Sequence, residues 1–151
     1  MTHPVILNLS KICFGYPGGP LVLDQLDFHL HAGDRIGLVA PNGSGKTTLF
    51  HIIMGLLKPL SGDVEAFGSI RQEEKDFWEV RRRIGLLFQD ADDQLFSPTV
   101  LEDVAVGPLN LGKTREEAID IARETLAFLG IDDFAERVTK KLSGGEKRLV
   151  S

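Results

Sequence analysis

The sequence of 151 residues carries 17 lysines and arginines against 22 aspartates and glutamates, a formal net charge of −5. This length suits a single domain that buries a sizeable core. Hydrophobic residues make up 42% and charged residues 26%, values that exclude a disordered or fibrous chain. Because the balance is acidic and no basic face is apparent, we expect no nucleic acid as the main partner.

The sequence predicts no direct insertion into a membrane. Its start lacks the basic region and apolar stretch of a secretory signal. The longest apolar runs, 36–40 and 52–57, are far shorter than the ~20 residues of a membrane span. Any work at a membrane would therefore go through a partner. The single cysteine, Cys13, excludes an intramolecular disulfide, which suits a reducing compartment, and we interpret it as a small buried residue.

Hydrophobic spacing predicts an alternation of strands and helices. Apolar and polar residues alternate over 26–31, which is typical of a strand with one wet face. The apolar runs 36–40 and 84–88 are typical of strands buried on both faces of a parallel sheet. The predicted strands are 5–9, 26–31, 36–40, 64–67 and 84–88. The predicted helices are 46–57, ended by Pro59 and Gly62, then 72–82, 100–106, stopped by residues 107–108, and 114–129.

The predicted helix 114–129 has the clearest boundaries. Thr114 and Glu117 have the spacing of a capping box, and Gly130 stands where a left-handed residue commonly ends a helix. An apolar stripe at helical spacing indicates core packing rather than function. Its members are Ala118, Ile121, Ala122, Thr125, Leu126 and Leu129.

The strongest functional signal is the segment Ala40-Pro41-Asn42-Gly43-Ser44-Gly45-Lys46-Thr47. It matches the phosphate-binding loop pattern G-x-x-x-x-G-K-[ST], with Ala40 in place of the first glycine. Glycines let successive N–H groups point at phosphate oxygens, and the start of the following helix adds about half a positive charge. Since Ala40 ends the predicted strand, we expect it to have a negative φ and to add little strain.

The loop therefore predicts a nucleotide site. Lys46 would bridge the outer phosphates, and the Thr47 hydroxyl would hold Mg²⁺, a hard cation that prefers oxygen ligands. The predicted nucleotide-binding residues are Asn42, Gly43, Ser44, Gly45, Lys46, Thr47 and Thr48.

The segment Leu-Ser-Gly-Gly-Glu at 142–146 is a second candidate anion site. Ser143 and Glu146 are spaced as a capping box, so a plain helix start is one interpretation. The other is an anion site, because Ser143, Gly144 and Gly145 leave several N–H groups bare at a positive helix end. The phosphate loop upstream makes this second interpretation the more specific one.

With these two motifs, the chain from Leu7 onward resembles the ATP-binding subunits of ABC transporters. Residues 40–47 resemble their Walker A loop, and 142–146 their signature motif, with Glu146 in place of the commoner glutamine. The resemblance implies that Tyr16 stacks on adenine and that Gln89 contacts Mg²⁺ and the attacking water, so Lys46 and Gln89 are the expected catalytic residues. Residues 88–112 resemble a narrower branch, the energy-coupling-factor transporters, which import cobalt, nickel or vitamins.

The resemblance implies an α/β fold of the P-loop NTPase class and ABC type, with a parallel core sheet, helices and an N-terminal antiparallel layer. Residues 1–151 would form one nucleotide-binding domain, in which roughly 90–142 is helical and contacts a partner. Two subunits, identical or paralogous, would pair head to tail and enclose ATP. The residues acting in trans would be Ser143, Gly144, Gly145 and Glu146. Closure would drive a transmembrane importer subunit, from the cytoplasmic face of the cell membrane.

The family pattern extends beyond Ser151. An apolar strand ending in Asp-Glu (Walker B), a D-loop and a switch histidine should follow, so we expect this chain to be an incomplete domain that ends after the signature motif. It should hydrolyse almost no ATP, since general base catalysis is worth about 10²–10⁴-fold. The following strand should lie beside 36–40, so we expect an exposed sheet edge and marginal stability without it. A short nucleotide-binding module without turnover and a soluble ABC ATPase outside transport remain alternatives.

Weaker candidates have simpler interpretations. Three residues on one strand face favour a solvated face over a metal site: Asp27, His29 and His31. Three acidic residues lack the glycine and closing glutamate of a Ca²⁺ loop: Asp90, Asp92 and Asp93. The arginines at 81–83 are interpreted as solvated charges at a helix end rather than a contact for headgroups or a partner. His51 is interpreted as a surface or core residue.

Overall fold

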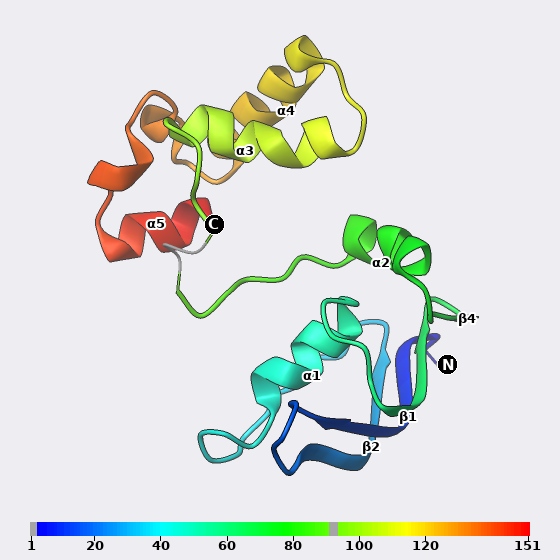
Figure 1. Cartoon of the computed structure of the whole chain (residues 1–151). Helices are drawn as coiled ribbons and strands as arrows, with labels where there is room; N and C mark the ends of the chain where they lie inside the picture. Colours follow the sequence, from blue (N-terminus) through cyan, green and yellow to red (C-terminus); the bar gives the residue numbers. More distant parts are fainter. Residues whose placement is uncertain (1–2, 91–93) are drawn as a thin grey trace. The chain divides into compact units, whose positions relative to one another are not determined.

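The computed structural model describes residues 3–90 and 94–151, and the chain forms two compact units, Met1–Leu86 and Leu87–Ser151 (Figure 1). Each unit has a hydrophobic core of its own. Over the described ranges, no helix combines the length and the apolar character that crossing a membrane requires.

A four-stranded antiparallel sheet forms the base of the first unit. β1 (Val5–Gly15) lies between β2 (Leu21–His31) and β3 (Ser61–Ala66), and β4 (Ser69–Ile70) extends the edge beyond β3. All three strand pairs are antiparallel. The antiparallel layer predicted near the N-terminus is therefore confirmed, and three of the predicted strands overlap β1, β2 and β3.

Helices α1 (Lys46–Ile53) and α2 (Phe77–Arg83) pack on this sheet and close its core. Leu9 of β1, Ile52 of α1 and Val80 of α2 are fully buried in one cluster. In Figure 1, α1 lies over the sheet. Burying a side chain of this kind stabilises the fold by roughly 1.5–3 kcal/mol.

Helix α1 ends at Ile53 rather than at the predicted residue 57, because Gly55 adopts a left-handed φ of 68°. A Cβ at Gly55 would lie 2.2 Å from Cγ of Phe77, so only a glycine lets α2 pack so closely. Arg81 of α2 donates from Nε to the Met54 carbonyl, at 2.9 Å, and so satisfies an oxygen at the end of α1. The predicted helix 72–82 is a short 3₁₀ turn, η1 (Glu74–Asp76), followed by α2.

The two strands predicted for a parallel core sheet, 36–40 and 84–88, are wrong for this chain. Neither run forms a strand, and the described sheet contains only antiparallel pairs. Val39 is 98% exposed and Ile36 is 48% exposed. An apolar run becomes a central parallel strand only where neighbouring strands bond to it on both sides. Within the described residues, no strand pairs with either run.

The second unit is helical. Its elements are α3 (Val100–Asn110), α4 (Arg115–Phe128), the 3₁₀ turns η3 (Asp132–Phe134) and η4 (Thr139–Lys141), and α5 (Gly144–Val150). Helix α3 continues through Pro108 instead of stopping there. Pro108 has no N–H to bond to the preceding turn, so it costs α3 one helical hydrogen bond, and the helix ends two residues later.

The predicted limits of α4 are confirmed. The Thr114 hydroxyl accepts from the Glu117 N–H at 3.2 Å, and the Glu117 carboxylate accepts from the Thr114 N–H at 2.9 Å. Gly130 follows the helix with a φ of 69°. The predicted core stripe is confirmed in part: Ala118, Ala122 and Leu126 are buried, whereas Leu129 is 56% exposed because it follows the last helical turn.

Candidate functional site

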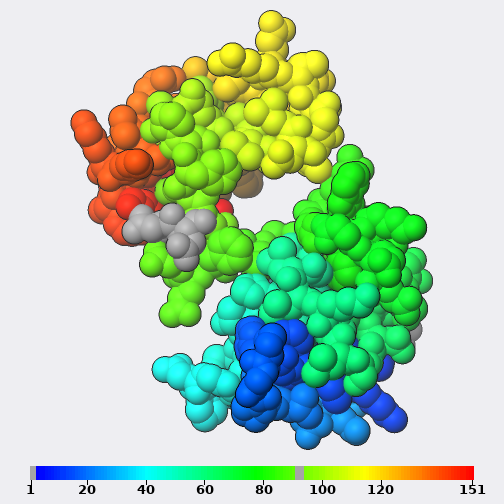
Figure 2. Space-filling view, viewed as in Figure 1, coloured from blue at the N-terminus to red at the C-terminus, as the bar shows by residue number. Residues whose placement is uncertain are grey.

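The phosphate-binding loop joins residue 40 to the start of α1, and its two glycines at Gly43 and Gly45 have φ values of 82° and 89°. Gly45 is also enclosed, because a Cβ there would lie 2.7 Å from Leu23 Cδ2 and 2.9 Å from Val22 Cγ1. Strand β2 therefore sets the position of the loop. The segment before Gly45 is exposed, and Figure 2 shows this cyan part of the chain projecting from the first unit.

The side chain of Lys46 forms hydrogen bonds with the phosphate-binding loop itself. Its Nζ donates to the Ala40 carbonyl at 2.7 Å, to the Pro41 carbonyl at 2.8 Å and to Ser44 Oγ at 3.4 Å. An ammonium has three donors, and here all three meet oxygens of the loop itself. Ala40 is not among the residues with positive φ, which confirms that the alanine adds no backbone strain.

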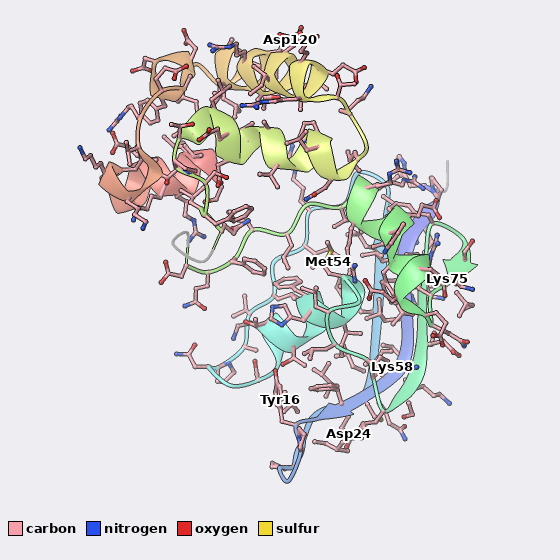
Figure 3. All side chains as sticks on the ribbon, turned by 45° about the horizontal axis from the view of Figure 1, so that its top comes forward. Tyr16, Asp24, Met54, Lys58, Lys75 and Asp120 are labelled. Atoms are coloured by element: carbon pink, nitrogen blue, oxygen red, sulfur yellow. The ribbon has the colours of Figure 1, made fainter. Side chains whose placement is uncertain are left out.

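Tyr16 lies beside the first turn of α1, as Figure 3 shows. Its hydroxyl is 3.2 Å from Oγ1 of Thr48, which is buried, and its ring packs edge-on against Phe14 with the centroids 5.1 Å apart. About half of the Tyr16 side chain (48%) remains exposed, so the ring has a free surface. Thr47 is exposed in the same helical turn. The structure thus places the predicted adenine and phosphate residues side by side.

The second motif forms the start of α5. Ser143 is the N-cap: its Oγ accepts from the Glu146 N–H at 3.4 Å, and its own N–H donates to Glu146 Oε2 at 2.7 Å. Hydrogen bonding from the Ser143 N–H and from Arg137 lowers the pKa of Glu146 to about 2. Gly144 and Gly145 are exposed at the positive end of the helix.

Arg137 is the residue that sequence reasoning missed. Its Nη1 donates to Glu146 Oε1 at 2.9 Å, and its guanidinium lies over the Phe134 ring, 4.4 Å from the centroid. Arg137 and Glu146 are joined by a segment that holds only the short 3₁₀ turn η4 and the start of α5, so no periodic pattern in the sequence could have indicated the pair.

Gln89 is exposed in the second unit, and its carbonyl accepts from Nη1 of Arg148 in α5 at 2.8 Å. It does not close a strand as predicted, because 84–88 is not a strand. Asp92 and Asp93 lie outside the described residues.

The weaker candidates have structural partners. Asp27 accepts from the Lys11 N–H at 2.8 Å, and His31 lies 3.4 Å from Asp34. Among residues 3–90 and 94–151, no group of three potential metal ligands is found. Cys13 is half-buried rather than fully buried, and the Gln25 N–H donates to its sulfur at 3.3 Å.

The prediction that the arginines at 81–83 are all solvated charges is wrong for two of them. Arg81 pairs with Glu74, and Arg83 lies 3.5 Å from the centroid of the Phe67 ring. Side-chain packing and ion pairing within the first unit therefore hold two of the three. His51 is half-buried in α1.

The ABC transporter family profile matches residues 23–151. A cobalt import ATP-binding protein, CbiO of Rhodobacter capsulatus, is 45% identical over 97% of this chain and 52% of its own length. An energy-coupling factor transporter ATP-binding protein, EcfA of Methanosphaera stadtmanae, is 42% identical over 97% of this chain and 53% of its own. The chain thus spans about half the length of the curated relatives that it matches.

The fold has a close counterpart among solved structures. CbiO1 of Clostridium perfringens, described as part of the ABC transporter complex CbiONQ, matches with a TM-score of 0.82 and 31% identity. The match covers 97% of this chain and 59% of CbiO1. The predicted fold family is therefore confirmed, although the parallel core sheet does not form among the described residues.

Proposed function

The chain belongs to the ABC transporter family, and from that premise we propose that it binds ATP with Mg²⁺ as part of an ATP-hydrolysing subunit that powers a membrane importer. The observation that carries the proposal lies in the first unit. Lys46 is held inside the phosphate-binding loop, and the half-exposed Tyr16 ring contacts Thr48 in the first turn of the same helix. A phosphate cradle and an aromatic surface thus flank one helix start, as an adenine nucleotide requires.

Phosphate binding would replace the internal hydrogen bonds of the loop. The ammonium of Lys46 would exchange the carbonyls of Ala40 and Pro41 for the outer phosphates, and Asn42 to Gly45 would supply N–H groups. Thr47 presents an exposed hydroxyl next to Lys46, which fits the oxygen preference of Mg²⁺, and Gln89 would be the second ligand. Bound Mg²⁺ would supply charge neutralisation at the phosphates.

The second unit would act on the nucleotide of a partner subunit. Ser143, Gly144, Gly145 and Glu146 form a capped helix start, which suits a phosphate contact in trans. We propose a head-to-tail dimer, either homodimeric or with a paralogous ATPase subunit, in which residues 1–151 are one nucleotide-binding domain. Roughly 90–142 would contact the transmembrane subunit, on the cytoplasmic face of the cell membrane.

The proposed cargo is cobalt, nickel or a vitamin. Support comes from the segment 88–112 and from relatives described as a cobalt import protein and an energy-coupling factor protein. Cells that lack the intact gene should lose uptake of one of these labelled cargoes. Unchanged uptake of all three would contradict the importer assignment without affecting ATP binding.

The first test is ATP binding by the intact protein, with and without Mg²⁺, measured by calorimetry. Lys46→Ala should weaken binding by about 10- to 100-fold, the worth of a charge-assisted hydrogen bond. Lys58→Ala is the matched control, because Lys58 is exposed and its Nζ lies 4.0 Å from Glu73. Equal affinities for Lys46→Ala and Lys58→Ala would contradict the phosphate role of Lys46. Phosphate release, measured in parallel, separates an ATPase from a module that binds without turnover.

A further inference from the structure

The carboxylate of Glu146 places a negative charge at the start of α5, where the proposed function requires an anion to approach. A carboxylate near a triphosphate repels it unless a cation lies beside the carboxylate. The second unit supplies such a cation.

Arg137 is that cation, and it is held in place by several contacts. Its N–H donates to the Phe134 carbonyl at 2.8 Å, and its own carbonyl accepts from the Val100 N–H at 3.1 Å. Its guanidinium lies over the Phe134 ring and meets Glu146 Oε1 at 2.9 Å. The backbone bonds fix the main chain of Arg137, and the Phe134 ring limits the positions of its planar guanidinium, so the ion pair loses little side-chain entropy on forming.

Glu146 connects this cation to the cap of α5. Its second oxygen, Oε2, accepts from the Ser143 N–H at 2.7 Å. The side chains of Arg137 and Glu146 are 39% and 29% exposed, so the pair is partly shielded from solvent. One carboxylate is therefore shared between the arginine and the backbone of the motif.

We propose that Arg137 is a positioning residue of the signature motif: through Glu146 it fixes Ser143 and cancels the negative charge that this motif carries. This inference rests on the proposed contact between the motif and the ATP of a partner subunit. It explains why a carboxylate is tolerated here, and it ties the presence of Arg137 to the presence of Glu146.

The test uses the intact protein and follows ATP-driven dimerisation by analytical ultracentrifugation. Arg137→Gln should weaken dimerisation by about two- to fivefold, the range of partly exposed ion pairs, and leave ATP binding by the monomer unchanged. Arg137→Gln combined with Glu146→Gln should restore dimerisation to within about twofold of Glu146→Gln alone, because no charge then needs cancelling. Arg123→Gln is the matched control, since Arg123 forms an exposed pair with Glu136 at 3.3 Å in the same unit.

The dimerisation of these variants tests the proposed role of Arg137. Full dimerisation by Arg137→Gln, or an equal loss in the double variant, overturns the proposal. If circular dichroism shows that Arg137→Gln does not fold, the comparison is made in the Glu146→Gln background. There, a loss of ATP-driven dimerisation on adding Arg137→Gln overturns the proposal. Normal ATP-driven dimerisation by Ser143→Arg would instead contradict the proposed contact in trans, so the two failures are distinguishable.

Discussion

Replacing Gly55 by alanine should destabilise the first unit by about 2–5 kcal/mol. The left-handed φ of 68° disfavours a side chain by about 1–2 kcal/mol. The new Cβ would lie 2.2 Å from Cγ of Phe77 and 2.6 Å from both Cδ atoms, and Phe77 is only 6% exposed, so the ring cannot swing into solvent. Overpacking of this kind adds about 1–3 kcal/mol. Such a loss is a large part of a typical stability of about 5–15 kcal/mol.

Gly68→Ala is the matched control. Gly68 has a similar φ of 75°, but a Cβ there would meet nothing within 4 Å. Both variants share the left-handed penalty and the ~0.4–1 kcal/mol gained by stiffening the unfolded chain. Urea unfolding of the intact protein should therefore show a clearly lower midpoint for Gly55→Ala than for Gly68→Ala, with the slope unchanged. Equal midpoints would refute the reasoning, because the contact with Phe77 would then contribute nothing.

Two further predictions concern the proposed nucleotide contacts. Tyr16→Ala should weaken ATP binding by about fivefold, which corresponds to about 1 kcal/mol of lost stacking, and leave the affinity for inorganic triphosphate unchanged. Calorimetry with both ligands measures the two affinities. An equal loss for both ligands would refute a role of Tyr16 at adenine. Glu146→Gln should change the acid sensitivity of folding. The Ser143 N–H and Arg137 lower the pKa of Glu146 from 4.5 to about 2, so its contribution is complete above about pH 4.5 and is lost as the pH falls through about 2. The difference in melting temperature between wild type and Glu146→Gln should therefore shrink over that interval; a difference that is constant with pH would argue against the ionised carboxylate.

The features that sequence predicted well are local ones. The capping boxes at Thr114 and Ser143 depend on partners three residues away, and the phosphate loop depends on a contiguous pattern. Both features can therefore be predicted from the sequence alone. The contact between Tyr16 and Thr48 spans 32 residues and was not predicted. Only the role of Tyr16 at adenine was predicted, and that came from the family resemblance. The pairing of Arg137 with Glu146 crosses a segment without periodicity and was not predicted.

The failed strands at 36–40 and 84–88 have a different cause. Apolar character indicates that a segment will be buried, but a strand also needs a neighbour for its hydrogen bonds. Whether an apolar run forms a central parallel strand therefore depends on residues elsewhere in the sheet as well as on the run itself. Val39, apolar and 98% exposed, shows the pattern without the neighbour.

The phosphate-binding loop keeps its form although the run before it is not a strand, and the contacts on its other side explain this. Val22 and Leu23 of β2 enclose Gly45, and Tyr16 contacts Thr48 in the first turn of α1. These anchors come from the antiparallel sheet, whose own pairs are complete without the run 36–40. Loop geometry and parallel-sheet formation are thus separable in this chain. In the proposed function the loop would bind through its backbone and Lys46. We therefore expect its affinity for phosphate to depend more on β2 and α1 than on the run 36–40 before it.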